Sequence, residues 1–332
     1  MVRNHHLGQA LLTRHQVWAS FCGQDGTAPW AGELPLAGTG RRALFDPGFL
    51  RRAVALVRRE KIEAIVASSL ISGLHGALLA RLTGRTFWMD EHNVEWHCSR
   101  RYGFRGWPLV WALEGFILKN ADWVTCVSPE DHERLVTGYR LPPERVLVAP
   151  NGVDFPALRE TSKKSFAPYS PQGRRTVLFF GVLNYPPNRE AVRILAEEIA
   201  PKSPPDIDFV VAGTGGDDLA ALYPNLRFEG FVDDIHALVR RCDGVLVPIR
   251  AGGGTRMKIL ESVACGRPVL STARGAEGLD LEAMGEALTV TDDLGETLEW
   301  LKALPSLSQA RPGVRFEDTY SWETIWARTM PL

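Results

Sequence analysis

The stretch RAGGGTRMKILESVACGRPVLS, residues 250–271, joins a glycine-rich turn to a helix-like run and then to a short strand-like piece. It follows the apolar segment DGVLVPIR, residues 243–250. Strand, turn, helix and strand in this order indicate one unit of a parallel α/β sheet. Glycines let the backbone approach a ligand closely, and the start of the following helix carries unpaired N–H groups. The stretch therefore also predicts an anion site, typically for phosphate.

Three charged side chains follow these glycines. Arg256 and Lys258 add positive charge at the start of the predicted helix, and Glu261 lies three residues after Lys258, on the same helix face. A carboxylate repels phosphate but can accept hydrogen bonds from a ribose diol. Cations followed by a carboxylate fit a nucleotide bound through its diphosphate and its ribose. The alternative is a solvated helix start with a surface Lys258–Glu261 pair, and the triple glycine favours the nucleotide site.

Strand-like and helix-like segments alternate through most of the 332 residues. Such alternation implies doubly wound parallel sheets, with ligands outside the carboxyl ends of the strands. Residues 155–175 are rich in proline, serine and charge and are predicted to be a linker, after which the alternation restarts at Thr176. We therefore expect an α/β protein with two Rossmann-like domains facing across a cleft, in residues 1–154 and 176–305.

The first 18 residues, MVRNHHLGQALLTRHQVW, are helix-like, with no strand before them. A doubly wound domain normally opens with a central strand and a glycine-rich turn. We therefore expect the N-terminal domain to lack its first strand, as a truncated or alternative start would produce.

Composition excludes several classes. The net charge of −1 does not point to nucleic acid, although residues 1–150 hold 18 Lys+Arg against 14 Asp+Glu, a weak preference for an anionic partner or membrane surface. No run approaches the roughly 18 apolar residues that cross a bilayer. The cysteines are dispersed and form no CxxC, which favours a reducing compartment over a zinc site or a disulfide framework; they are Cys22, Cys98, Cys126, Cys242 and Cys265. We expect Cys126 and Cys265 to be core residues.

Two nucleotide motifs fit poorly. No GxxxxGK[ST] string occurs, so a Walker loop is excluded. The segment AGTGGDDL, residues 212–219, begins like GxGxxG but has Asp218 at the last glycine position. A nicotinamide-dependent oxidoreductase stays open as an alternative, with Asp233 or Asp234 as its acidic residue. We interpret Asp233 and Asp234 as a loop cap rather than as a metal-ligand pair.

With these segments placed, the chain resembles the retaining glycosyltransferases of family 4, which have the GT-B fold. The resemblance covers nearly the whole chain and rests on motifs in the family's order: DEHNVE (90–95), ADWVTCVSPED (121–131), VAPNGVD (148–154), FFGVLNYPPN (179–188), VVAGTG (210–215), RFEGFVDDI (227–235) and GGGTRMKILESVACGRPVLSTARGAEGL (252–279). YSWETIW, residues 320–326, is similar to the closing helix, so residues 306–332 are expected to cross back to the first domain.

The resemblance assigns a donor site to the second domain. Glu261 matches the second glutamate of the family's ExxxxxxxE motif, which contacts the ribose. The first glutamate of the motif would fall at position 253, where this chain has Gly253 instead. A GGGTR branch of the family, which this chain is similar to, also lacks that glutamate. Donor-sugar contacts are then expected from backbone N–H groups, and the expected donor-binding residues are Gly181, Gly252, Gly253, Gly254, Thr255, Arg256, Lys258 and Glu261.

The family often has an arginine and a lysine after the glycine of FFG. Here these places hold Val182 and Pro187 or Asn188, none of them basic. We therefore hypothesise that Arg256 and Lys258 supply the missing charge. The resemblance also implies that no metal ion or other cofactor is required, because helix dipole and cations replace it.

His92, in MDEHNVEW, matches a family histidine that contacts the donor sugar, and is the expected catalytic residue; the alternative is a structural loop histidine. Asp90, Glu91 and Glu95 are nearby acids. The implied reaction is a same-face displacement in which the leaving phosphate accepts the acceptor's proton. The expected activity is transfer of a sugar, with retention, from a nucleoside diphosphate sugar to a glycan or lipid-linked acceptor.

Other activities stay open: a non-catalytic sugar-nucleotide-binding module, or a same-fold epimerase or phosphorylase. The segment RRYGFRGWPLVWALEGFILKN, residues 100–120, fits either a membrane surface or packing on the first domain. We favour packing, with Glu114 as a polar interruption. The expected location is cytoplasmic, with peripheral contact at the inner face of the membrane as an option.

Overall fold

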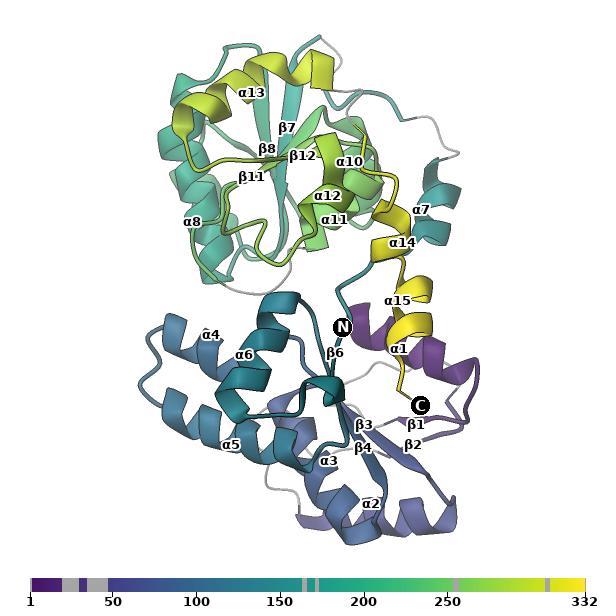
Figure 1. Ribbon diagram of the computed structural model, residues 1–332. Coiled ribbons are helices and arrows are strands. Elements are labelled where there is room, and N and C mark those ends of the chain that lie inside the picture. The colour runs from purple at the N-terminus through teal and green to yellow at the C-terminus, as the bar shows by residue number, and fades with distance from the viewer. Residues whose placement is uncertain are drawn as a thin grey trace. The chain divides into compact units, whose positions relative to one another are not determined.

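The computed structural model describes residues 2–19, 30–34, 47–162, 166–170, 173–252, 257–307 and 311–331. The chain divides into two compact units; the first combines purple-to-teal segments with the yellow helix α15 (Trp322–Thr329) in Figure 1. The first unit combines Met1–Pro150 with Trp322–Leu332, and the second is Asn151–Ser321. All strand pairings among the described residues are parallel, which confirms the predicted α/β class with parallel sheets.

The first unit contains a four-stranded sheet in the order β3-β4-β5-β6 and a separate pair, β1-β2. Its strands are β1 (Trp18–Ala19), β2 (Gly32–Glu33), β3 (Ala64–Ala67), β4 (Thr86–Asp90), β5 (Trp123–Cys126) and β6 (Val146–Val148). Its helices are α1 (Val2–Leu12), α2 (Pro47–Arg59), α3 (Leu70–Thr83), α4 (Glu95–Arg101), α5 (Trp107–Asn120), α6 (Pro129–Tyr139) and α15 (Trp322–Thr329).

The pleat of β4 decides which helices cover each face of this sheet. Successive strand residues point to opposite faces. Phe87 and Met89 meet α3, where a side chain on Gly76 or Gly73 would overlap them. Trp88 points the other way and lies edge-on to Trp326 of α15, with ring centroids 6.0 Å apart. The glycine face of α3 thus packs close to one face of the sheet, and α15 covers the other.

The second unit contains a six-stranded sheet in the order β12-β11-β10-β7-β8-β9, the doubly wound order of a Rossmann fold. Its strands are β7 (Arg175–Phe180), β8 (Ile207–Ala212), β9 (Arg227–Gly230), β10 (Gly244–Val247), β11 (Val269–Ser271) and β12 (Leu288–Val290). Its helices are α7 (Phe155–Ser162), α8 (Pro186–Ile194), α9 (Asp217–Leu222), α10 (Ile235–Arg241), α11 (Met257–Ala264), α12 (Leu281–Met284), α13 (Leu294–Leu307) and α14 (Phe316–Tyr320). Helices α8 and α13 lie on one side of the sheet, and α10, α11 and α12 on the other (Figure 1).

The segment 155–175 differs from a plain linker. It begins with α7, whose Phe155 and Leu158 are buried in the core of the second unit. These two apolar residues are three apart, so they share one helix face. Because proline, serine and charged residues surround Phe155 and Leu158, the composition of the segment did not indicate this short amphipathic helix.

The expected packing of residues 100–120 holds for one half only. In α5, Gly115, Ile117 and Leu118 are buried. Glu114 does not interrupt this packing, since it is itself fully buried. Tyr102, Phe104, Leu109 and Trp111, around the α4–α5 turn, are exposed. Among the described residues, Cys126 and Cys265 are buried as expected, and no helix is long and apolar enough to cross a membrane.

A close approach of two loops fixes the carboxyl end of the second sheet. Gly181 N donates to Ala212 O (2.9 Å), and Gly213 N donates to Gly230 O (2.7 Å). Gly213 has φ +144, and a Cβ there would lie 1.8 Å from the Gly181 carbonyl oxygen. Only glycine fits this crossing of the β7 and β8 loops.

Gly213→Ala is therefore expected to destabilise the chain by about 3 kcal/mol or more, because the added carbon overlaps backbone. Gly230→Ala is the matched control, since Gly230 has φ +65 but open space around it. Its expected cost is about 1 kcal/mol, from the backbone conformation alone. Urea unfolding of both variants measures the difference. Equal losses would show that the crossing is not tight.

Candidate functional site

Lys258 projects from the first turn of α11 to the loop after β7. Its Nζ donates to Asn188 Oδ1 (3.0 Å) and lies 4.2 Å from the Phe179 ring centroid. The same nitrogen is 2.9 Å from where a Cβ of Gly181 would stand. Asn188 in turn donates to Val182 O (2.8 Å). Lys258 thus brings a positive charge to a loop whose own sequence has none at the expected places.

Glu261 lies one turn further along α11, with 21% of its side chain exposed. Burial raises the pKa of Glu261, and the nearby Lys258 charge opposes that rise. His236 of α10 faces it, with Nε2 4.0 Å from Glu261 Oε1. A partly buried carboxylate beside a lysine has acceptor capacity for a hydroxyl-bearing ligand.

His236 is a candidate site residue that the sequence did not reveal. Its Nε2 is buried, without a hydrogen-bond partner among the described residues. Burial lowers the pKa of His236, which the charge of Asp234 partly offsets. Asp234 itself caps α10, accepting from Ala237 N (2.9 Å), which confirms its interpretation as a cap. The sequence indicated Asp234 as a cap, but the pairing of His236 with Glu261 depends on α10 lying beside α11.

The glycine-rich turn is only partly described. Gly252 is buried and has φ +98, a conformation that favours glycine. Gly253, Gly254, Thr255 and Arg256 lie outside the described residues. Their expected backbone and charge contacts to a donor therefore stay predictions.

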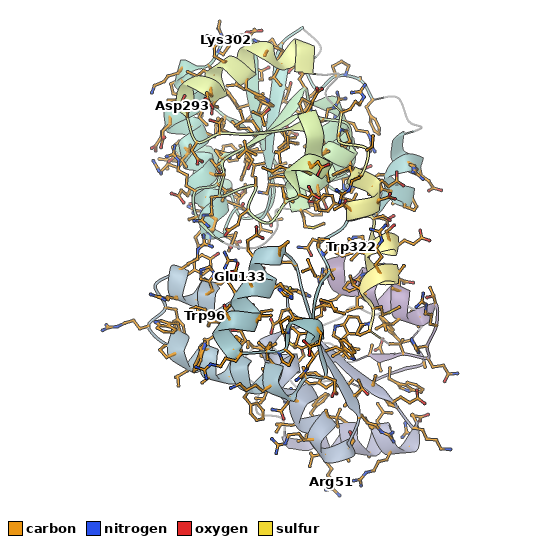
Figure 2. All side chains as sticks on the ribbon, viewed as in Figure 1. Arg51, Trp96, Glu133, Asp293, Lys302 and Trp322 are labelled. Atoms are coloured by element: carbon orange, nitrogen blue, oxygen red, sulfur yellow. The ribbon has the colours of Figure 1, made fainter. Side chains whose placement is uncertain are left out.

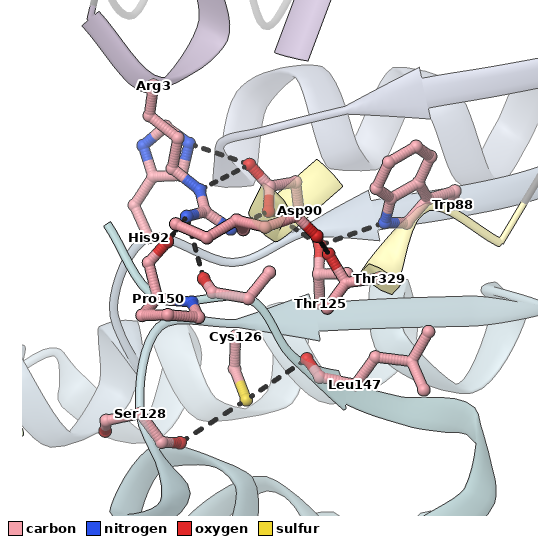
Figure 3. A network of polar contacts seen from close by, with 12 residues as sticks. Arg3, Trp88, Asp90, His92, Thr125, Cys126, Ser128, Leu147, Pro150 and Thr329 are labelled. Carbon is pink, nitrogen blue, oxygen red and sulfur yellow. Dashed lines mark hydrogen bonds and ion pairs between the residues drawn. The ribbon is translucent and has the colours of Figure 1, made fainter. Parts of the chain in front are cut away.

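In the first unit, His92 lies two residues after the end of β4, and 29% of its side chain is exposed. Its Nε2 lies 3.2 Å from Asp90 Oδ2. Figure 3 shows Asp90 between His92, Arg3 and Thr125. Burial alone would raise the pKa of the Asp90 carboxyl, but the Arg3 charge and the hydrogen bonds from His92 and Arg3 hold that pKa below its usual range. Asp90 is therefore a carboxylate beside the histidine.

Glu91 points into the interior among other acids. Its side chain is 3% exposed, and its Oε1 has no hydrogen-bond partner among the described residues. Burial and the neighbouring carboxylates, Glu114 first, raise the pKa of Glu91 well above its usual value. These surroundings therefore favour the protonated, neutral form of the Glu91 side chain over the carboxylate.

Glu114 is the better-satisfied member of this group. It accepts from Glu95 N (2.7 Å), Trp96 N (3.1 Å) and Tyr139 Oη (2.6 Å). Burial raises its pKa to about 7, against the effect of these three hydrogen bonds. The Glu114 carboxylate on α5 thus caps the N-terminal end of α4. Among the described residues, no group of three or more His, Cys, Asp or Glu side chains is arranged to hold a metal ion.

Glu91→Gln is expected to stabilise the chain at pH 8 and to have little effect at pH 5. The raised pKa means that the folded state keeps a proton that the unfolded state has lost, so wild-type stability falls as pH rises above about 4.5. Glutamine has no proton to lose, and the expected gain at pH 8 is about 1 kcal/mol or more.

Urea unfolding at both pH values measures this difference. Glu133→Gln, on the exposed side of α6 (Figure 2), is the matched control and should show no such pH dependence. A Glu91→Gln gain that is equal at pH 5 and pH 8 would contradict a neutral, buried Glu91.

Comparison with known proteins places both units. A family model described as Glycosyltransferase Family 4 matches residues 2–155, and one described as Glycosyl transferases group 1 matches residues 174–304. A phosphatidylinositol N-acetylglucosaminyltransferase component of Arabidopsis thaliana is 26% identical over an alignment of 294 residues that covers 82% of this chain. The match spans 62% of that relative's length.

Solved structures share the fold. The sucrose-phosphate synthase of Thermosynechococcus elongatus superposes with a TM-score of 0.75 at 20% identity, over 98% of this chain and 90% of its own. HepE of Anabaena, solved with UDP and glucose, superposes with a TM-score of 0.70 at 17% identity, over 97% and 93%. The parallel sheets, the doubly wound second unit and the two family matches together lead to one conclusion: the chain belongs to the family 4 type of group 1 glycosyltransferases, with the GT-B fold.

Proposed function

We propose that the chain transfers a sugar, with retention of configuration, from a nucleoside diphosphate sugar to a glycan or lipid-linked acceptor. The observation that carries this proposal is the placement of Lys258 at the loop after β7, beside Gly181 and one turn before Glu261. This arrangement matches a diphosphate followed by a ribose. HepE, which shares the fold, was solved with UDP-glucose and with UDP and glucose, which supports a nucleotide-sugar donor.

Each proposed donor-binding residue of the second unit has a distinct role. Lys258, together with Arg256, neutralises the diphosphate, whose charge increases as the glycosidic bond breaks. Glu261 accepts hydrogen bonds from the ribose hydroxyls. The backbone N–H groups of the turn at 252–255 hold the diphosphate and the sugar. The proposal includes no metal ion and no other cofactor.

His92 is the proposed catalytic residue of the first unit. Its imidazole is part-exposed at the carboxyl end of a parallel strand, where ligands of α/β folds bind. There it would contact a hydroxyl of the donor sugar while the bond to the leaving diphosphate breaks. The acceptor attacks from the same face, and its proton passes to the leaving phosphate, so the reaction needs no protein nucleophile.

Lys258→Ala and Arg256→Ala are each expected to weaken binding of the accepted UDP- or GDP-sugar about tenfold or more, because each removes a charge-assisted contact to phosphate. Isothermal titration calorimetry measures this affinity, after a thermal-shift screen has identified the base. Lys202→Ala, an exposed lysine of the same unit, is the control. Unchanged affinity in both variants would refute the proposed donor site.

His92→Gln is expected to lower kcat for sugar transfer about a hundredfold while donor affinity stays near that of the wild type, because the histidine acts in the transition state. Transfer to acceptor and hydrolysis of donor are measured together. Donor binding by the wild type without either reaction would instead support a non-catalytic module, and conversion of the donor sugar without an acceptor would support an epimerase.

The exposed turn between α4 and α5 supports the membrane part of the proposal. Residues 96–113 contain three arginines and no Asp or Glu. Four large apolar side chains are exposed there: Tyr102 49%, Phe104 54%, Leu109 78% and Trp111 43%. Aromatic side chains with neighbouring arginines suit an anionic lipid surface, where rings enter the interface and guanidinium groups reach phosphates. We propose a cytoplasmic enzyme that contacts the inner face of the membrane through this turn.

The wild-type chain is therefore expected to co-sediment with vesicles containing phosphatidylglycerol and not with phosphatidylcholine vesicles. Replacing Phe104 and Leu109 by serine should abolish this binding. Leu222→Ser combined with Leu281→Ser removes equally exposed side chains of the second unit and should leave it intact. To test the contribution of charge, vesicle binding of Arg105→Gln is compared with that of Arg51→Gln. Arg51 is an exposed arginine of α2, in the same unit (Figure 2). Equal binding by all variants would disprove the contact.

A further inference from the structure

The carboxylate of Asp90, two residues before His92, has its full set of contacts. Oδ1 accepts from Arg3 Nη2 (2.6 Å) and from Thr125 Oγ1 (2.6 Å). Oδ2 accepts from Arg3 Nε (2.9 Å) and lies 3.2 Å from His92 Nε2. A carboxylate has about four acceptor positions, so these four contacts fill it. Its side chain is completely buried, a costly place for a charge without such partners.

Arg3 holds this carboxylate from the first turn of α1. Its guanidinium forms a two-bond fork with Asp90, and its Nη1 donates to Ala149 O (2.8 Å) and Pro150 O (3.2 Å), just beyond β6. The same group lies over the Trp326 ring, 4.8 Å from its centroid. Arg3 therefore connects α1, the ends of β4 and β6, and α15, and it has little freedom to move.

His92 is the partner of Asp90 with the most freedom. The Thr125 side chain is fully buried, and it also accepts from Trp88 Nε1 (2.9 Å). The Arg3 side chain is 5% exposed, against 29% for His92. The fork and the threonine would hold Asp90 in the same orientation without the histidine. Asp90 therefore determines the orientation of the His92 ring, and His92 does not determine the orientation of Asp90.

We propose that Asp90 is a positioning residue for His92, and that Arg3 of α1 acts through it. An ionised carboxylate can only accept, so its contact with Nε2 requires the proton on that nitrogen. The proton on Nε2 leaves Nδ1 unprotonated in the neutral ring, able to accept a hydrogen bond from a sugar hydroxyl. This last step rests on the proposed function; the coupling of Asp90 to the ring does not. Glu95 is a further charged group that interacts with His92.

Asp90→Asn tests the inference, because the amide NH₂ can donate to Nε2 and so stabilise the opposite tautomer. This variant leaves the Arg3 guanidinium buried without a counter-charge, which can prevent folding. The double variant Arg3→Met/Asp90→Asn removes both charges and avoids that cost. Asp122→Asn is the matched control: Asp122 accepts from Phe87 N (2.8 Å) at the opposite end of β4, away from His92.

Two measurements are made on the full chain. Imidazole ¹⁵N chemical shifts, assigned by comparison with His92→Gln, should show the Nε2–H tautomer in the wild type and in Asp122→Asn. They should show loss of that preference in the Asp90 variants. In sugar transfer, kcat of the Asp90 variants should fall about tenfold or more, with a smaller change in the donor KM, because ring orientation matters most at the reacting centre.

A folded Asp90 variant that keeps the wild-type tautomer of His92 would overturn the inference, whatever its kcat. Failure of the proposed function has a different signature. If His92→Gln transfers sugar like the wild type, His92 is not catalytic, and the ¹⁵N shifts still report whether Asp90 sets its tautomer.

Discussion

The first unit depends on the compensation of one buried charge. Asp90 is fully enclosed, and an enclosed carboxylate is tolerated only with opposite charge and hydrogen bonds. Arg3, Thr125 and His92 supply them from α1, β5 and the segment after β4 (Figure 3). The same contacts that stabilise the charge thus determine where the N-terminal helix docks and how the histidine is presented.

The second unit depends on a steric constraint rather than a charge. Gly181 and Gly213 let the β7 and β8 loops touch backbone to backbone, which leaves no side chain between them. Lys258 extends to that point from α11 and rests on Phe179 and Asn188. A cation thus reaches the loop after β7 from α11, although Val182, Pro187 and Asn188 are not basic.

The two carboxylates at the end of β4 illustrate how pleat and burial separate neighbouring residues. Asp90 points to the face covered by α1 and α15 and stays ionised because Arg3 is there. Glu91, one residue later, enters a group of acids with Glu114, and these acids raise its pKa. The raised pKa of Glu91 and the depressed pKa of Asp90 follow from these surroundings, since the two side chains begin from similar intrinsic acidity.

The sequence by itself determined the α/β class, the parallel sheets, the family and the order of its motifs, because strand and helix periodicity and glycine-rich turns are local properties. It also placed Lys258, Glu261 and His92 at the ends of strands or the start of a helix. It could not reveal α7, the exposed side of the α4–α5 turn or the burial of Glu114, because composition does not say which face of an amphipathic segment is covered.

Only the tertiary structure decided the long-range partners. Arg3 and Asp90 are 87 residues apart, Asn188 and Lys258 are 70 apart, and His236 meets Glu261 across two helices. No local pattern encodes such pairs, since they arise when parallel strands bring their carboxyl ends to one edge and the connecting segments fold over it. The residue types were visible in the sequence, while their partners, burial and protonation follow from packing alone.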